Sequence, residues 1–157
     1  MKYYLSLGSN KGNKRDNLNT AFMELEQVGE ISNRSGYYET EPVGLKEQDD
    51  FLNTVCVLHS NLRPFRLLLK LKQIESRLGR TPAVRWDARI IDIDILDWSG
   101  EAIVTDTLTI PHSRMNERGF VLVPLQEAAP DYKNRQGHNI QTLINNLESN
   151  QRIKRID

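Results

Sequence analysis

This sequence of 157 residues has a single cysteine, no formal net charge and no long apolar run. Cys56 is the only cysteine, so no disulfide can form within the chain and a reducing compartment is expected. Its apolar neighbours Val55 and Val57 indicate an unreactive thiol in the core. No apolar run approaches the length of a transmembrane helix, and residues 1–5 lack the apolar stretch of a signal peptide. We therefore expect a cytoplasmic protein with no membrane partner.

Neither sign of charge is in excess, which argues against a broad class of partners. Lys and Arg together number 21, Asp and Glu also number 21, and the formal net charge is zero. General nucleic-acid binders need a basic excess, so we expect no nucleic-acid partner. Hydrophobic residues at 38% and charged residues at 27% describe an ordinary globular protein. Without internal repeats or linkers, the chain is predicted to form one domain over residues 1–157.

Two aspartates interrupt an apolar run at residues 89–96, which reads R-I-I-D-I-D-I-L and predicts a buried strand. Side chains alternate along a strand, so Asp92 and Asp94 point to the same face, about 7 Å apart. Two neighbouring carboxylates in an apolar strand repel each other and require cations, and oxygen ligands on a rigid strand suit Mg²⁺. A half-exposed edge strand with a solvated acidic face is the alternative, which the short motif alone does not exclude. Three arginines upstream favour a site for a metal and an anion: Arg80, Arg85 and Arg89.

Local patterns predict the order strand, helix, strand, strand, helix, strand. Asn13 is a candidate cap for the first helix, Pro64 suits the first turn of the second, and Gly79 ends it. The expected strands are 3–7, 31–40, 51–60 and 89–96. This order is that of a ferredoxin-like α+β fold, an antiparallel sheet with both helices on one face, although the fold alone does not choose a function. C-terminal additions are expected as short strands near 101–104 and 107–110 and helices at 120–129 and 140–147.

Three loops lie between the expected strands and helices. Residues 8–13 superficially resemble a phosphate loop, but the G-K-[ST] ending and the dinucleotide spacing are missing, which favours a plain strand-to-helix turn. Residues 41–50 form a polar loop that is long for a hairpin, and long loops in compact domains are often functional. Residues 80–88 lack periodicity and predict a mobile surface loop.

Four stretches in a fixed order resemble the hydroxymethyldihydropterin pyrophosphokinase family. They are residues 38–44 (Y-E-T-E-P-V-G), 50–53 (D-F-L-N), 79–94 (ending in I-I-D-I-D) and 111–120 (from P-H to E-R-G-F). The resemblance implies a monomeric enzyme of folate biosynthesis. Such an enzyme transfers pyrophosphate from ATP to the hydroxymethyl group of 6-hydroxymethyl-7,8-dihydropterin and releases AMP.

The resemblance also implies roles for individual residues. Two Mg²⁺ ions are expected on Asp92 and Asp94, with Arg80 and Arg89 completing the catalytic set. Positions that face ATP in the family correspond to Glu75, Arg85, Trp86, Arg89, Ile95, Thr109, His112 and Arg118. Positions that face the pterin correspond to Thr40, Val43, Gly44, Phe51, Asn53, Trp86 and Phe120.

Elementary chemistry agrees with these assignments but leaves alternatives for some of them. ATP brings about four negative charges and the aspartates two more, so further cations beyond two Mg²⁺ are needed. The arginines can supply them, with His112 as a further candidate. A flat pterin needs aromatic faces and an amide for its polar edge, as Phe51, Phe120 and Asn53 provide. Plain core packing is the alternative for the two phenylalanines, and a surface ion pair with Glu117 is the alternative for Arg118.

Several departures from the family pattern lie near the ATP-handling groups. The segment between Gly79 and Trp86 is one residue shorter than in many family members, and Asp87-Ala88 replaces a frequent Gly-Pro. Pro82-Ala83 and Ser113 are further departures. They motivate a second hypothesis, a catalytically weak relative that binds pterin or nucleotide. An RNA-binding ferredoxin-like domain lacks its aromatic-basic strand pattern here, and a D-x-D sugar transferase needs a larger framework.

Overall fold

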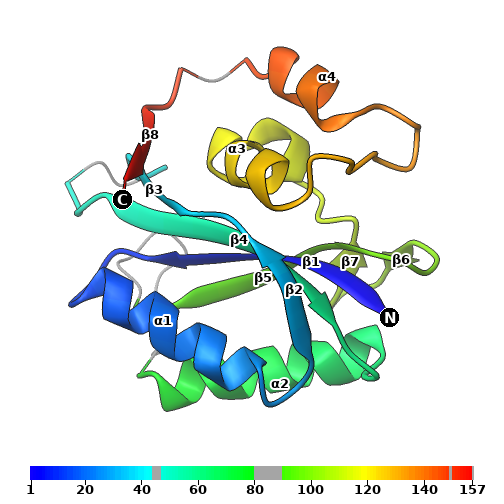
Figure 1. Cartoon of the computed structure of the whole chain (residues 1–157), viewed down its shortest axis with the longest axis horizontal. Helices are drawn as coiled ribbons and strands as arrows, with labels where there is room; N and C mark the ends of the chain where they lie inside the picture. The colour runs from blue at the N-terminus through cyan, green and yellow to red at the C-terminus, as the bar shows by residue number, and fades with distance from the viewer. Residues whose placement is uncertain (44–46, 80–89, 149, 157) are drawn as a thin grey trace.

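The computed structural model describes residues 1–43, 47–79, 90–148 and 150–156. An antiparallel six-stranded sheet has α1 and α2 on one face and α3 on the other, with α4 packed outside α3 (Figure 1). The strands follow the order β5-β1-β4-β3-β8, and β2 also pairs with β4. The ferredoxin-like α+β arrangement predicted from the sequence is confirmed.

The first half of the chain contains β1 (Lys2–Ser9), α1 (Lys14–Leu25), β2 (Glu30–Arg34), β3 (Tyr37–Thr40), β4 (Phe51–His59) and α2 (Pro64–Arg77). The second half contains β5 (Asp92–Trp98), β6 (Ile103–Val104), β7 (Thr109–Ile110), the 3-10 turn η1 (Met115–Glu117), α3 (Gly119–Ala128), α4 (Ile140–Asn145) and β8 (Ile153–Ile156). No helix among the described residues is long and apolar enough to cross a bilayer.

Two hydrophobic cores lie on opposite faces of the sheet. The first fills the space between the sheet and the helices α1 and α2, and the second lies under α3. β4 is buried on both faces, which accounts for its apolar run at residues 55–58. Cys56 lies in the first core, where burial raises the pKa of its thiol to about 12. The prediction of an unreactive core thiol is thus supported.

Helix boundaries follow the local signals read from the sequence. The side-chain oxygen of Asn13 accepts a hydrogen bond from the backbone N–H of Asp16 at 3.1 Å. Pro64 is the first residue of α2, where its missing N–H costs nothing. Gly79 has a φ of 93°, a left-handed conformation that favours glycine, and it follows the end of α2.

The expected single strand at 31–40 was wrong, because the chain breaks there into β2 and β3. At the break, the Ser35 hydroxyl accepts a hydrogen bond from the Val55 backbone N–H at 3.0 Å and lies 3.0 Å from the Thr54 hydroxyl. The Arg155 guanidinium lies against Gly36, where an added Cβ would come within 2.6 Å of it. Arg155 belongs to β8, an edge strand that the sequence reading missed.

A β-bulge in β5 shifts the alternation of its side chains between the two faces of the sheet. Leu5 pairs with Ile95 while the preceding Tyr4 pairs with Asp97, so Leu96 is the extra residue. Asp97 accepts a hydrogen bond from the Tyr132 hydroxyl at 2.7 Å, and Leu96 joins the core under α3. Before the bulge, the alternation places Asp92 and Asp94 on this same α3 face of the sheet.

Candidate active site

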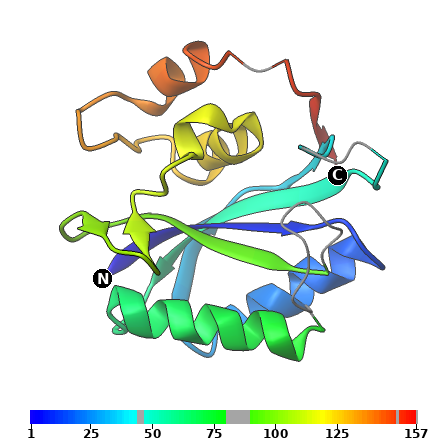
Figure 2. The same cartoon turned by 180° about the vertical axis from the view of Figure 1, so that it is seen from behind.

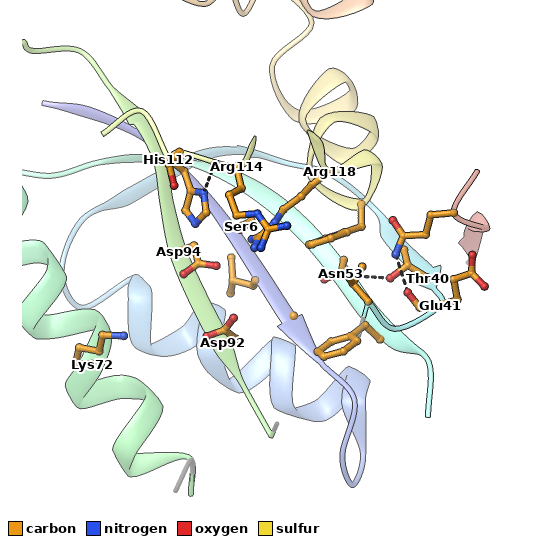
Figure 3. A pocket seen from close by; sticks show the side chains of 17 residues that line it. Ser6, Thr40, Glu41, Asn53, Lys72, Asp92, Asp94, His112, Arg114 and Arg118 are labelled. Carbon is orange, nitrogen blue, oxygen red and sulfur yellow. Dashed lines mark hydrogen bonds between the residues drawn. The ribbon is translucent and has the colours of Figure 1, made fainter. Parts of the chain in front are cut away.

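A cavity of about 380 Å³ lies on the α3 face of the sheet, in front of β1, β4 and β5 (Figure 3). Its lining combines acidic, basic, amide and aromatic side chains from segments that are far apart in sequence. The described residues that line it are Ser6, Leu7, Gly8, Thr40, Glu41, Val43, Phe51, Asn53, Lys72, Asp92, Asp94, His112, Ser113, Arg114, Arg118, Phe120 and Gln151.

Asp92 and Asp94 form one end of this cavity. Their cross-strand partners on β1 are Gly8 and Ser6, and Figure 3 shows the two carboxylates one above the other on β5. Burial, and then the neighbouring Asp92 carboxylate, raise the pKa of Asp94 from its ordinary 3.8 to about 7. Arg118 and Lys72 act in the opposite direction on the same carboxylate. Burial and repulsion from Asp92 therefore disfavour ionisation of the Asp94 carboxylate.

This donor set fits Mg²⁺. Among the described residues, no group of three or more His, Cys, Asp or Glu side chains is placed to hold a metal ion. A structural zinc site needs such a group, whereas Mg²⁺ takes one or two carboxylates and completes its shell with water and phosphate oxygens. A pair of carboxylates in an open cavity meets the second requirement.

His112 lies beside the carboxylates and is neutral. Its backbone N–H donates to the Leu96 carbonyl at 2.8 Å, which ties the segment after β7 to the bulge of β5. Burial, and then Arg118, lower the pKa of His112 to about 4. The Nδ1 atom accepts a hydrogen bond from the Arg114 backbone N–H at 3.1 Å, so the ring proton is assigned to Nε2. In the ligand-free protein, His112 is therefore placed to act as a neutral donor, and its contribution of positive charge beside ATP stays a prediction.

Arg118 stands at the start of α3, and its guanidinium carbon lies 5.5 Å from the centre of the Phe120 ring. Arg114 carries a second guanidinium to the cavity from the turn that precedes α3 (Figure 3). The ion pair expected as an alternative for Arg118 forms instead between Arg114 and Glu117, at 3.2 Å. Sequence reasoning missed Arg114 because no motif distinguishes it from other exposed arginines.

Lys72 is another cation that the sequence reading missed. It reaches the cavity from α2, and its Nζ atom lies 3.6 Å from the Glu75 Oε1 atom. Glu75 itself is 2% exposed and accepts a hydrogen bond from the Ile93 backbone N–H at 2.7 Å. Because Ile93 lies between the two aspartates, Glu75 fixes the free edge of β5 where they stand. Figure 2 shows α2 running alongside this edge.

Three of the expected nucleotide-facing residues lie outside the cavity lining. Glu75 is buried between α2 and β5, and Ile95 is buried in the core between the sheet and the helices α1 and α2. Thr109 is half-buried in β7. The expected residues Gly44, Arg80, Arg85, Trp86 and Arg89, with the loop at 80–88, fall outside the described part of the chain.

The other end of the cavity is formed by an amide, a hydroxyl and two aromatic rings. The Asn53 Nδ2 atom donates to the Thr40 hydroxyl at 2.6 Å. Phe51 and Phe120 both line the cavity and remain partly exposed, so neither is only a core residue. Val43 lies beside them and is 41% exposed.

Gly8 makes room for Asn53. A Cβ atom at this position would lie 2.7 Å from the Asn53 Oδ1 atom and 3.5 Å from the Phe51 ring. Sequence reasoning treated Gly8 only as part of a turn. The available signal was its place at the end of a strand, where an isolated glycine often marks a close approach of other atoms.

The fold and the cavity together define a class. A strand-borne pair of carboxylates surrounded by Lys72, Arg114 and Arg118 suits a magnesium-dependent enzyme that acts on phosphate groups. An amide and two aromatic rings that line the same cavity suit a flat heterocycle with a polar edge.

Comparison with known proteins identifies the family. The profile of the 7,8-dihydro-6-hydroxymethylpterin-pyrophosphokinase (HPPK) family matches residues 4–130. The 2-amino-4-hydroxy-6-hydroxymethyldihydropteridine pyrophosphokinase of Bacillus subtilis is 45% identical over 126 residues, which are 79% of this chain and 75% of that protein. The Haemophilus influenzae protein of the same name is 35% identical over 153 residues, which are 96% of both chains. This chain belongs to the HPPK family of pyrophosphokinases.

Longer proteins also contain a similar region. The folic acid synthesis protein FOL1 of Dictyostelium discoideum is 44% identical over 129 residues, and this chain spans 20% of that protein. A crystal structure of an HPPK-DHPS protein with substrates aligns with a TM-score of 0.72 at 16% identity. The alignment covers 92% of this chain and 42% of that one, so it supports the fold alone.

Proposed function

We propose that this protein transfers pyrophosphate from ATP to the hydroxymethyl group of 6-hydroxymethyl-7,8-dihydropterin and releases AMP. One observation carries the proposal: a single cavity has the Asp92–Asp94 pair at one end and Asn53 with two aromatic rings at the other. A triphosphate and a pterin bound at the two ends would meet at the middle. Family membership supplies the identity of both substrates.

The metal site is proposed at the two aspartates. Asp92 and Asp94 would hold two Mg²⁺ ions between the ATP phosphates and the pterin alcohol. Bound Mg²⁺ would neutralise phosphate charge and lower the pKa of the attacking hydroxyl group. The raised pKa of Asp94 supports this assignment, because it reflects burial and repulsion from Asp92, both of which a bound cation would offset.

The triphosphate end is proposed to use the cations around the aspartates. Arg118 and the neutral Nε2–H of His112 would donate hydrogen bonds to phosphate oxygens, with Lys72 and Arg114 adding charge. Family resemblance adds further residues to the ATP site as proposals: Arg80, Arg85, Trp86, Arg89, Glu75, Ile95 and Thr109. Glu75 would then act indirectly, through its hydrogen bond to Ile93.

The pterin end is proposed to sandwich the heterocycle between Phe51 and Phe120. The Asn53 amide and backbone groups near Thr40, Val43 and Gly44 would read its polar edge, with Trp86 covering it. Binding requires that the Asn53 amide exchange its present bond to Thr40 for a ligand contact or share it. Because both partners are buried, an apolar edge in place of the pterin edge would leave them unpaired and bind weakly.

In the reaction, the hydroxymethyl oxygen would attack the β-phosphorus of ATP. The new bond joins this oxygen to the β-phosphorus, the bond between the β-phosphorus and the α,β-bridging oxygen breaks, and AMP leaves with that electron pair. The hydroxyl proton passes to solvent, so no dedicated side-chain base is required. The protein would contribute mainly by positioning and by stabilising charge.

The test is incubation of the protein with ATP, Mg²⁺ and 6-hydroxymethyl-7,8-dihydropterin, followed by separation of the nucleotides. We expect AMP and the pterin pyrophosphate in equal amounts, and none from Asp94→Asn beyond background. Asp106→Asn, at an exposed turn, is the matched control and should keep the wild-type rate. ADP formed without pterin would contradict the proposal, and tight binding of both ligands without AMP would select the catalytically weak relative.

The domain organisation, oligomeric state and location of the protein are proposals as well. β8, from the end of the chain, pairs with β3, from its first third, which supports a single domain over residues 1–157. We propose a monomer in the cytoplasm, as the family resemblance implies. Sedimentation of the purified protein would test the first of these.

A further inference from the structure

The segment that ends the chain contributes to the cavity from outside the region matched by the family profile. The match ends at residue 130, whereas Gln151 lines the cavity and β8 begins two residues after it. β8 extends the sheet by pairing with β3, with Ile153 opposite Thr40 (Figure 1). β8 therefore lies next to Thr40, whose hydroxyl accepts a hydrogen bond from the Asn53 amide.

Gln151 and Arg152 hold the segment that follows β3. The Gln151 Nε2 atom donates to the Glu41 carbonyl at 2.6 Å, and the Arg152 backbone N–H donates to the Glu41 side chain at 2.9 Å. The Glu41 backbone N–H in turn donates to the Arg152 carbonyl at 3.4 Å. Glu41 directly follows Thr40, so these bonds fix the backbone beside the Thr40–Asn53 pair. Figure 3 shows Thr40, Glu41 and Asn53 together at this end of the cavity.

The other end of the same loop is held from both sides. The Arg152 guanidinium pairs with the Asp50 carboxylate, directly before Phe51. From the α1 side, the Lys14 Nζ atom donates to the Asp50 carbonyl at 2.8 Å, and the Asn10 Nδ2 atom donates to the Gln48 side chain at 2.8 Å. Both described ends of the 41–50 segment are thus anchored. The C-terminal segment contributes Gln151 and Arg152 at the first end and the Arg152 guanidinium at the second.

β8 also contacts the opposite wall of the cavity. Ile153 packs against Gly119, where an added Cβ would lie 2.6 Å from the Ile153 Cδ1 atom. Gly119 stands between Arg118 and Phe120, two residues that line the cavity. The Arg155 guanidinium pairs with Glu127 of α3 at 2.9 Å, and Glu127 accepts a hydrogen bond from the Tyr38 hydroxyl at 2.6 Å. The C-terminal strand therefore joins the loop wall to the α3 wall.

We propose that Gln151 is a positioning residue for the pterin: its amide holds the Glu41 carbonyl and thereby sets the backbone at 40–43 against Asn53. The proposal rests on the proposed pterin substrate and deepens it, because it assigns a specificity role to a residue beyond the family match. Gln151 donates to the Glu41 carbonyl, beside Thr40 at the pterin end, so its effect should fall on the pterin and not on ATP.

The test compares Gln151→Met with Lys154→Met. Methionine keeps the length of the glutamine side chain but donates no hydrogen bond, and Lys154 is an exposed residue of the adjoining strand β8. We expect Gln151→Met to raise the KM for the pterin about fivefold, as the loss of one part-buried hydrogen bond implies. The KM for ATP and kcat should stay close to wild type, the thermal midpoint should fall by no more than about 2–4 °C, and Lys154→Met should change none of these values.

A second variant separates the hydrogen bond from the shape of the side chain. Gln151→Glu keeps the shape but places an ionised acceptor against the Glu41 carbonyl, so the pterin KM should rise more than in Gln151→Met. An unchanged pterin KM in both variants would overturn the proposal. Equal rises in both KM values with a lower thermal midpoint would also overturn it, because they indicate a merely structural role.

The proposed function and this inference fail in different ways. If the wild-type protein forms no AMP, the reaction is wrong, and the pterin dissociation constants of wild type and Gln151→Met, measured by pterin fluorescence, still test Gln151. If the wild type is active and the two variants match it, only the role of Gln151 is wrong.

Discussion

Asp94→Asn should stabilise the ligand-free protein, and more so at high pH. The pKa of Asp94 is raised from 3.8 to about 7, first by burial and then by Asp92. The folded pKa lies above the unfolded one, so the contribution of this group to stability is full below pH 3.8 and is lost as pH rises through 7. Above pH 7 the ionised carboxylate destabilises the fold. Asparagine cannot ionise, so the substitution removes this loss.

The magnitude follows from the same pKa. A rise from 3.8 to about 7 corresponds to about 4 kcal/mol for a group sealed from water. The cavity is open to solvent, which screens the repulsion. We therefore expect the difference in unfolding free energy between Asp94→Asn and wild type to increase by about 1–2 kcal/mol from pH 5 to pH 8. Urea denaturation at pH 5, 6, 7 and 8, without divalent metal, measures this gain. Asp106→Asn is the control and should show no pH-dependent gain.

Magnesium provides the second arm of this experiment. A ligand that binds only the folded state stabilises it in proportion to the logarithm of its concentration, so Mg²⁺ should stabilise the wild type at pH 8 and leave Asp94→Asn nearly unaffected. A stability difference between variant and wild type that is the same at pH 5 and pH 8 would refute the reasoning about this carboxylate.

Three further predictions concern residues around the site. Gly8→Ala should weaken pterin binding about tenfold in a fluorescence titration, because its Cβ would lie 2.7 Å from the Asn53 Oδ1 atom; an unchanged affinity would show that Asn53 is not held there. Glu75→Ala should lower the free energy of unfolding by about 1–3 kcal/mol by leaving the Ile93 N–H unpaired, whereas Glu75→Gln, which still accepts, should lose less. Tyr132→Phe should cost about 1 kcal/mol in the same denaturation assay, because the buried Asp97 loses the hydroxyl that donates to it at 2.7 Å.

Local signals in the sequence were sufficient for the helices and the central strands. Asn13, Pro64 and Gly79 mark helix ends through their own backbone and side-chain chemistry, which does not depend on distant residues. The break at Ser35 and the strand β8 depend on partners far along the chain, such as Val55 and Glu127. β8 is half exposed and carries charges at Lys154 and Arg155, so no apolar pattern marks it.

The residues of the candidate site also fall into two groups: those that a local sequence pattern identifies and those that depend on distant parts of the chain. Asp92 and Asp94 were predictable because strand alternation fixes their common face. Lys72, Arg114 and Gln151 were not, because each reaches the cavity only through tertiary packing. The neutral state of His112 depends on burial and on Arg118, which a sequence pattern does not report.

The most direct test of the central claim is single-turnover formation of AMP from ATP and the pterin by Asp92→Ala and Asp94→Ala, with excess Mg²⁺. Circular dichroism on the same samples verifies that both variants are folded. We predict a fall of at least about a hundredfold for each, as expected when charge stabilisation at the reacting phosphate is lost. A folded variant that forms AMP at the wild-type rate would contradict the account.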